Sequence, residues 1–202
     1  MCPENENPAL ERRIEALLAR LQGGDKKAMD ELLPLLFDDL RKLARAQRNR
    51  VGGGETLRTT ALIHEAYLKL RRSRSLSPDS RRHFLHTAAL AMRHILIDHA
   101  RSQLAAQDRH ELMHAGNEDS LGAVQRQARL VLDIDSALAE LQQTEPRLVN
   151  IVNYRYFAGY NEAETADLLE VSARTVRRDW VRAKTWLADK LESHDPAPAV
   201  RN

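Results

Sequence analysis

NEAETADLLEVSARTVRRDWVRAKTWL, residues 161–187, carries the clearest structural signal in the chain. Ala163, Ala166 and Leu169 predict a short helix, and residues 170–172 predict a tight turn after it. A second helix follows Ser172, whose hydroxyl is placed to cap it. Its apolar residues recur at steps of four, three and four, which is typical of one buried helix face: Val176, Trp180, Ala183 and Leu187. This pattern predicts a helix-turn-helix.

The turn departs from the usual pattern at Glu170. Turns of this kind usually have glycine before the branched apolar residue, here Val171. We therefore expect Glu170 to adopt a positive φ, at a cost of about 1 kcal/mol for a residue with a Cβ atom.

The second helix of this unit is rich in cations that two nearby aspartates, Asp179 and Asp189, cannot all neutralise. Cations near the beginning of this helix can contact base edges and phosphates. The helix dipole also favours a phosphate at this end. The predicted duplex-contacting residues are Arg174, Thr175, Arg177, Arg178, Arg182 and Lys184. The alternative is an amphipathic surface helix with salt bridges to its own aspartates.

Helical periodicity runs through the rest of the chain, and alternating β-branched runs are nearly absent. Helices are predicted over residues 8–22, 25–50, 60–72, 81–107, 127–142, 145–157, 161–169 and 173–191, with Pro34 kinking or dividing the second. We expect an all-α protein of two helical domains joined by a flexible linker. The predicted parts are a first domain over 1–107, a linker over 108–126, a second domain over 127–192 and a frayed tail over 193–202.

Composition excludes several classes of protein. The chain has 202 residues, a net charge of +2 and one cysteine, so an internally disulfide-bonded scaffold is excluded. The beginning of the chain does not read as a signal peptide, and no apolar run is long enough for a membrane helix, so we expect a cytoplasmic protein without a membrane partner. Residues 1–107 carry 19 basic and 13 acidic side chains, and residues 108–202 carry 12 and 16, which sum to the 31 and 29 of the whole chain. A basic first half is compatible with a polyanionic partner.

Three blocks together resemble a known family. They are TALIHEAYL at 60–68, AMRHILIDHAR at 91–101, and YFAGY at 156–160 leading into the helix-turn-helix. The chain resembles bacterial sigma factors of the extracytoplasmic-function (ECF) type, and most closely the subgroup with a Thr-Ala-Leu-x-His-Glu-Ala-Tyr-Leu segment. The resemblance extends from about residue 10 to residue 191.

The resemblance implies a non-enzymatic, cofactor-free factor that binds core RNA polymerase, at the β′ clamp helices and the β flap, and promoter DNA. The first domain would dock on polymerase and open the minus-ten element, and the last helix would read the minus-thirty-five element. The docking residues implied are His64, Glu65, Lys69 and Arg72. The minus-ten residues implied are Ser80, Arg81, Arg82, His86, Arg93, His94, Asp98 and Arg101. Phe84 is the one aromatic available there for stacking on a base. The resemblance also admits an anti-sigma protein as a regulator, and a free chain that is a monomer.

Two other hypotheses remain open from the residues. One is a stand-alone helix-turn-helix regulator whose first domain dimerises or senses a ligand. The other is an all-helical metal-dependent enzyme that uses His94, Asp98 and His99, although no cysteine cluster or zinc-protease spacing supports it.

Overall fold

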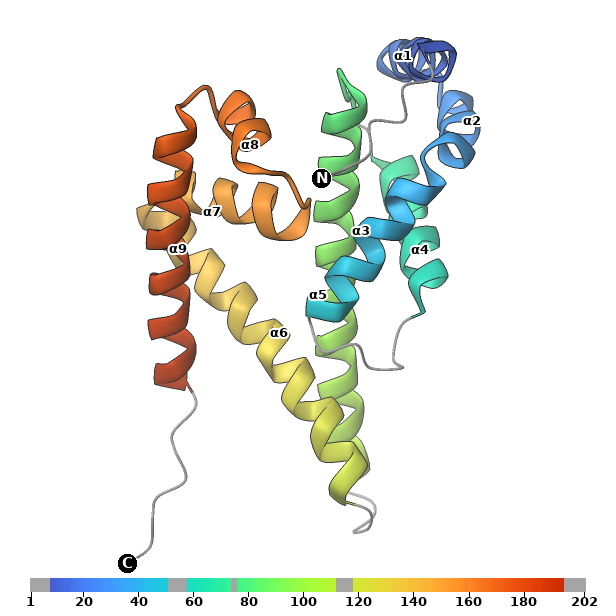
Figure 1. Cartoon of the computed structure of the whole chain (residues 1–202). Helices are drawn as coiled ribbons and strands as arrows, with labels where there is room; N and C mark the ends of the chain where they lie inside the picture. Colours follow the sequence, from blue (N-terminus) through green and yellow to red (C-terminus); the bar gives the residue numbers. More distant parts are fainter. Residues whose placement is uncertain (1–7, 51–57, 74–75, 112–117, 195–202) are drawn as a thin grey trace, which may run out of the picture. The chain divides into compact units, whose positions relative to one another are not determined.

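The computed structural model describes residues 8–50, 58–73, 76–111 and 118–194 (Figure 1). Within these ranges the regular elements are all helical, and no strand occurs, which confirms the all-α prediction. The helices of the first half are α1 (Pro8–Gln22), α2 (Lys27–Leu35), α3 (Phe37–Arg50), α4 (Thr59–Arg72) and α5 (Arg81–Glu111). Those of the second half are α6 (Glu118–Thr144), α7 (Pro146–Val152), the π-helical turn η1 (Asn153–Phe157), α8 (Glu162–Leu169) and α9 (Ala173–His194).

The described part of the chain forms two compact units that divide within α5, between Ile95 and Leu96. The first unit contains α1, α2, most of α3, α4 and the first half of α5. The second contains the remainder of α5 and the helices from α6 onward. The predicted linker over 108–126 overlaps the end of α5 at Glu111 and the beginning of α6 at Glu118, and residues 112–117 lie outside the described residues.

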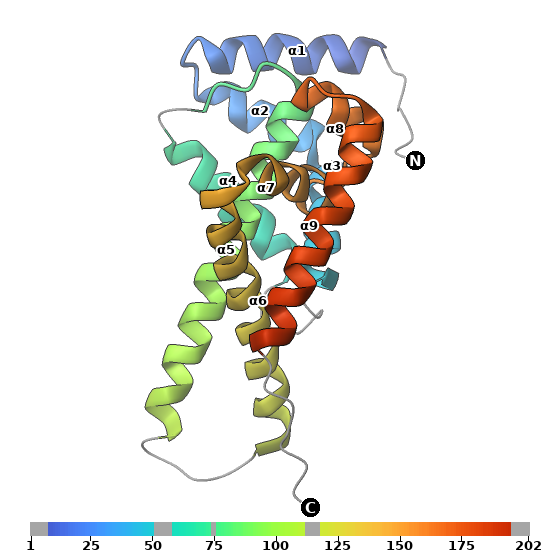
Figure 2. The ribbon, with the colours of Figure 1, turned by 90° about the vertical axis from the view of Figure 1, so that its left-hand side faces the viewer.

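Two sequence signals explain how the first unit is divided. The helix predicted over 25–50 breaks at Leu36, two residues after Pro34, because proline cannot donate the backbone hydrogen bond that a continuous helix needs. Asp25 accepts a hydrogen bond from the Lys27 amide at 3.0 Å, close to the beginning of α2. Helix α1 lies beside α2, as Figure 2 shows.

Apolar side chains at helical spacing fill the core of the first unit. Ile14, Leu18, Leu32, Leu62 and Met92 are all less than 3% exposed. The aromatic member is Phe84, at 1% exposed, whereas the neighbouring Leu85 is only partly buried. The Phe84 ring therefore packs in the core and is not available to stack on a nucleic-acid base.

The second unit is built around α9, which packs against α6, α7 and α8. Its main cluster contains Leu138 and Leu141 from α6, Leu148 and Val152 from α7, and Ala183 from α9. A second cluster joins the end of α5 to α6 through Ile97, Ala100, Ala128 and Val131, with Leu104 and Leu132 against it. Residues 118–126, expected as linker, belong to α6, a helix that these apolar contacts anchor further along.

The turn before α9 gives the first prediction. Glu170 has φ 53°, as expected for this position, and its amide and that of Val171 bond back into α8. Glu170→Gly should raise the free energy of unfolding by about 0.5–1 kcal/mol, because glycine adopts this conformation without strain.

Glu170→Ala is the control for that substitution, since alanine has the same Cβ strain and should leave stability nearly unchanged. Urea unfolding followed by circular dichroism measures both variants. Equal free energies of unfolding of the glycine and alanine variants would show that the positive φ at residue 170 causes no strain.

Candidate nucleic-acid interface

The helix-turn-helix forms as the sequence predicts, and each of its helices has a side-chain cap. Asn161 accepts a hydrogen bond from the Glu164 amide at 2.9 Å, while Glu164 accepts one from the Asn161 amide at 2.8 Å. The Thr175 amide donates to Ser172 Oγ at 3.1 Å, which confirms the predicted cap of α9. The beginnings of both helices are therefore fixed by local bonds, and Figure 1 shows α8 joined to α9 by a short turn.

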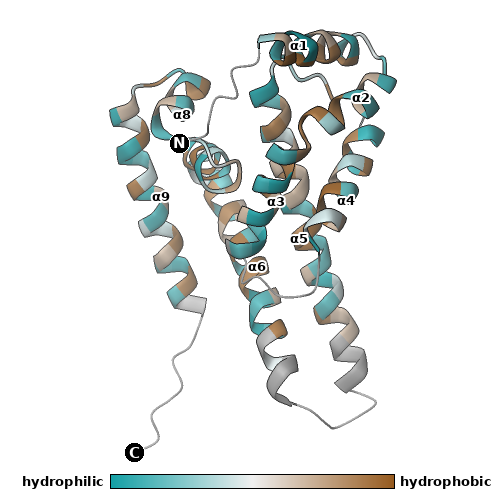
Figure 3. Ribbon diagram, turned by 45° about the vertical axis from the view of Figure 1, so that its right-hand side comes forward, coloured by the Kyte–Doolittle hydropathy of each residue, from teal (hydrophilic) through white to brown (hydrophobic). Residues whose placement is uncertain are grey.

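Helix α9 separates its apolar and charged residues. Val176 and Ala183 are fully buried, and Trp180 and Leu187 pack partly buried against the core, which confirms the predicted stripe. Figure 3 shows this mixture as polar and apolar residues interleaved along α9. Because the apolar stripe faces α6, α7 and α8, most of the remaining residues lie on the outside, with Asp179 as a buried exception.

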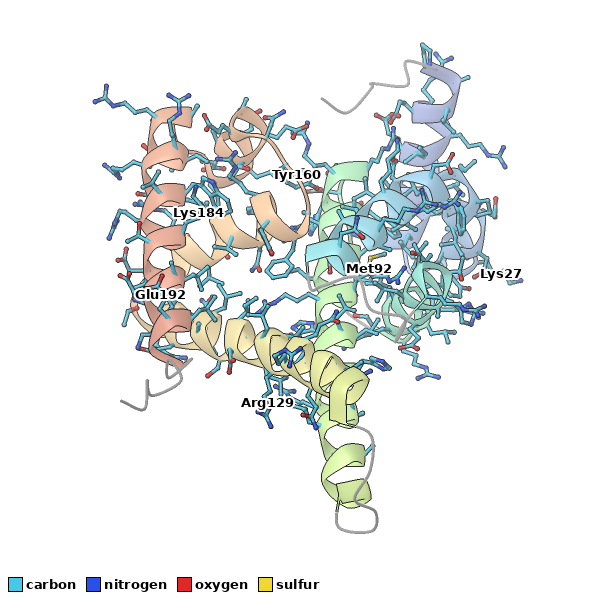
Figure 4. All side chains as sticks on the ribbon, turned by 60° about the horizontal axis from the view of Figure 1, so that its bottom comes forward. Lys27, Met92, Arg129, Tyr160, Lys184 and Glu192 are labelled. Carbon is cyan, nitrogen blue, oxygen red and sulfur yellow. The ribbon has the colours of Figure 1, made fainter. Side chains whose placement is uncertain are left out.

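The outer face of α9 presents the predicted cations at its exposed surface. Arg174 is exposed near the beginning of the helix, and Thr175 beside it is partly buried and bonds to Ser172. Lys184, labelled in Figure 4, has its Nζ 5.5 Å from the centre of the Trp180 ring. None of these side chains is enclosed by the core, so a polyanion can reach them.

Arg177 forms a paired contact with the beginning of α8. Its Nε and Nη2 donate to Glu162 Oε2 at 3.1 and 2.8 Å, and its side chain remains 70% exposed. The hydrogen bonds from Arg177 hold the pKa of the Glu162 carboxyl below its ordinary value, and they hold the pKa of Arg177 above its own. Glu162 also lies 3.5 Å from Arg155, so it bridges two arginines.

Arg178 and Arg182 converge on the side chain of Asp179, which is completely buried. Arg178 Nε donates to Asp179 Oδ1 at 3.1 Å, and Arg182 Nη1 lies 3.7 Å from the same oxygen. Asp179, one of the two aspartates of α9, therefore pairs with both Arg178 and Arg182. Both arginines nevertheless remain exposed, at 63% and 48%.

At the beginning of α5, two of the expected minus-ten residues have structural partners. Ser80 Oγ accepts a hydrogen bond from the His83 amide at 3.1 Å, so Ser80 caps the helix. Arg81 contacts Glu11 of α1 and lies 2.6 Å from Asp39 of α3. These bonds fix the position of the helix end, and they leave less of Arg81 available to a nucleic acid.

Further along α5 the expected residues lie on two faces, since each residue turns the helix by about 100°. Arg82, His86 and Arg93 share one face, and of these only Arg82 is exposed. His94, Asp98 and Arg101 share another, where Arg101 lies 3.7 Å from Asp98 and 3.2 Å from Asp135 of α6. A single nucleic-acid strand along one face of α5 would therefore not contact all eight expected residues.

The expected polymerase-docking residues lie on the outside of α4. His64, Glu65, Lys69 and Arg72 are exposed, and the opposite side of the helix buries Leu62, Ile63, Ala66 and Leu70. Tyr67 on this helix hydrogen-bonds Asp30 of α2 through its hydroxyl, which anchors α4 to the unit. The expected docking residues therefore lie on a helix that this hydrogen bond joins to α2.

The metal-enzyme hypothesis receives no support from the geometry. In the described ranges no group of three or more His, Cys, Asp or Glu side chains is arranged to hold a metal ion, the set around His94, Asp98 and His99 included.

The same part of the chain contains no helix long and apolar enough to cross a membrane.

Two arginines outside the predicted set belong to the same neighbourhood. Arg147 of α7 lies 2.7 Å from Asp179 Oδ2, and Arg155 of η1 stacks over Trp180 with its guanidinium carbon 5.1 Å from the ring centre. Their positions depend on how α7 and η1 pack against α9, which sequence periodicity does not reveal.

The environment of His86 gives a prediction about stability. Burial lowers the pKa of His86 to about 4 from an ordinary 6.5, and the neighbouring His83 adds to the shift. Between pH 6.5 and about 4, His86 is protonated in the unfolded chain but stays neutral in the folded chain. The free energy of unfolding therefore decreases as the pH falls through this range. His86→Gln should lose less stability over this window than the wild type does.

Urea midpoints measured at intervals from pH 7 to pH 4 provide the comparison, with His64→Gln, an exposed site on α4, as the matched control. If the wild type and His86→Gln lose stability in parallel, the buried histidine does not have the low pKa.

Comparison with protein families agrees with this geometry. A family model described as ECF sigma factor matches residues 11–193, which includes every helix from α2 to α8 and most of α1 and α9. Searches of curated proteins and of solved structures found no match. Since the family match spans nearly the whole chain, the protein belongs to the ECF sigma factor family and is a non-enzymatic alternative sigma factor that directs transcription initiation by core RNA polymerase at promoter DNA.

Proposed function

We propose that α9 reads the minus-thirty-five element as duplex DNA through the face that carries Arg174, Thr175, Arg177, Arg178, Arg182 and Lys184. The observation that carries this proposal is the exposure of these cations on a helix whose beginning is fixed by the Ser172 cap. Arginine side chains form bidentate contacts with guanine and with phosphate, and an exposed helix face of this kind fits the major groove.

For the first unit, we propose that α4 docks on polymerase, at the β′ clamp helices, and that α5 contacts the minus-ten element. The exposed set His64, Glu65, Lys69 and Arg72 supports the docking surface. For the minus-ten element, Arg82 and His94 are exposed, whereas Ser80 and Arg81 are partly buried. With Phe84 in the core, capture of an opened strand rests on cations and hydrogen bonds.

The remaining assignments are proposals of the same kind. Residues 1–107 would form the docking and minus-ten part, 108–126 the connection, and 127–192 the part that reads the upstream element and touches the β flap. The factor would act in the cytoplasm, where the chromosome and polymerase are. It would be monomeric when free, and an anti-sigma protein that covers α4 or α9 would inactivate it.

Run-off transcription tests the proposed function directly. Core polymerase is supplied with a pool of random promoter sequences, with and without this chain, and specific transcripts should appear only when the chain is present. A stand-alone regulator would instead bind an operator duplex tightly without polymerase and yield no new transcript. That result would contradict the proposal.

A substitution in α9 should show whether this helix reads bases. Arg174→Ala should lower transcription from a selected promoter by about 5- to 150-fold, the value of a bidentate arginine contact of about 1–3 kcal/mol, and should relax selection at one upstream position.

Arg129→Ala is the matched control for this loss of charge. Arg129 is exposed on α6, as Figure 4 shows, and its removal should leave transcription unchanged. Equal effects of the two substitutions would mean that Arg174 contributes only general positive charge.

A further inference from the structure

The side chain of Asp179 lies at the centre of a charged cluster that joins the beginning of α7 to α9. It is 0% exposed, and three arginines surround it: Arg147 at 2.7 Å, Arg178 at 3.1 Å and Arg182 at 3.7 Å. A carboxylate buried this completely is costly unless it is paired and hydrogen-bonded. The arrangement therefore has to be explained by what Asp179 holds in place.

Arg147 is the member of this cluster that comes from outside the helix-turn-helix. It lies in the first turn of α7, directly after Pro146, and the packing of α7 on α9 brings it to Asp179. Glu145, just before α7, contacts Arg182 at 2.6 Å, so residues on both sides of Pro146 form ion pairs with α9. Arg147 is thereby placed beside two residues of the expected DNA face.

The cluster has more positive than negative charge. Three guanidinium groups face two carboxylates, Asp179 and Glu145, which leaves one net positive charge. Each guanidinium has five N–H donors, and the contacts with the two carboxylates use only some of them. Because Arg147, Arg178 and Arg182 are about half or more exposed, the remaining donors can reach a partner in solution.

We propose that Arg147 contacts a DNA phosphate together with α9, and that buried Asp179 is the positioning residue that orients Arg147, Arg178 and Arg182 toward the DNA backbone. This inference rests on the proposed role of α9 and extends it to a residue of α7. A fixed carboxylate holds three flexible side chains in one arrangement before DNA arrives, which lowers the entropy lost on binding. Phosphate contacts from two helices also fix the register of α9 on the duplex.

The competing explanation is that the cluster only fastens α7 to α9. The two explanations differ in what a change of charge does. Asp179→Asn removes one negative charge and so makes the net charge of the protein more positive by one. If only general electrostatic attraction mattered, this change would make DNA binding tighter. If Asp179 positions the arginines, the same substitution should weaken binding.

The test measures binding of the full chain to a short random-sequence DNA duplex over a series of salt concentrations, without polymerase. Arg147→Gln should reduce the slope of log K against log salt by about one, as expected for one lost phosphate contact. Arg129→Gln, which removes the same charge from α6, should leave the slope near that of the wild type.

Asp179→Asn is compared with Asp189→Asn, an exposed residue of the same helix, so that both variants gain the same charge. Asp189→Asn should bind as tightly as the wild type or more tightly, and Asp179→Asn should bind more weakly. Circular dichroism establishes that each variant is folded. If Asp179→Asn fails to fold, the comparison of Arg147→Gln with Arg129→Gln decides alone.

The proposal is overturned if Arg147→Gln changes the slope no more than Arg129→Gln does. The positioning role of Asp179 is overturned if its asparagine variant folds and binds DNA as Asp189→Asn does. Because no polymerase is present, this result is separate from the transcription assay, and failure of that assay would instead refute the proposed function.

Discussion

Helix α9 must meet two demands at once, because the same helix completes the core of the second unit and carries the cations expected to meet DNA. Val176 and Ala183 are fully buried, while Arg174 and Arg178 remain outside. With about 3.6 residues per turn, the two sets of residues occupy different faces of the helix, and packing of α9 against α6, α7 and α8 keeps the apolar face inward. The Ser172 cap and the left-handed Glu170 fix where the helix begins, so they also fix which residues face outward.

The proposed minus-ten contacts of the first unit depend on charge, because no phenylalanine, tyrosine or tryptophan is exposed on the described part of α5. The only phenylalanine on α5, Phe84, lies in the core. Arg81, the first residue of α5, joins the beginning of this helix to α1 and α3 through ion pairs. Gln47 adds a buried tie, since its Nε2 donates to the carbonyl of Ala89 at 2.9 Å. A firmly anchored α5 can present Arg82 and His94 at constant positions. We infer that melting of the minus-ten element depends more on ionic contacts here than on base stacking.

The sequence predicts those features that depend on residues close together in the chain. The Ser172 cap, the positive φ of Glu170 and the break after Pro34 are of this kind, and all are confirmed. It does not predict the burial of Asp179, because its partner Arg147 lies far away in the chain and meets it only through helix packing. The linker over 108–126 is predicted because polar residues and Gly122 interrupt the periodicity; residues 112–117 of it lie outside the described residues, and α6 begins at Glu118 and packs on α5 further along.

We propose that α9 meets the minus-thirty-five element when the factor is bound to polymerase. An iron chelate attached to α9 tests this contact most directly. Thr185, which is exposed on α9, is changed to cysteine to carry the chelate, and the one native cysteine, Cys2, is changed to serine. Hydroxyl radicals generated in the complex with core polymerase should cut promoter DNA at and beside the minus-thirty-five element. Cuts confined to other parts of the promoter, or equal cutting along the whole duplex, would contradict the account.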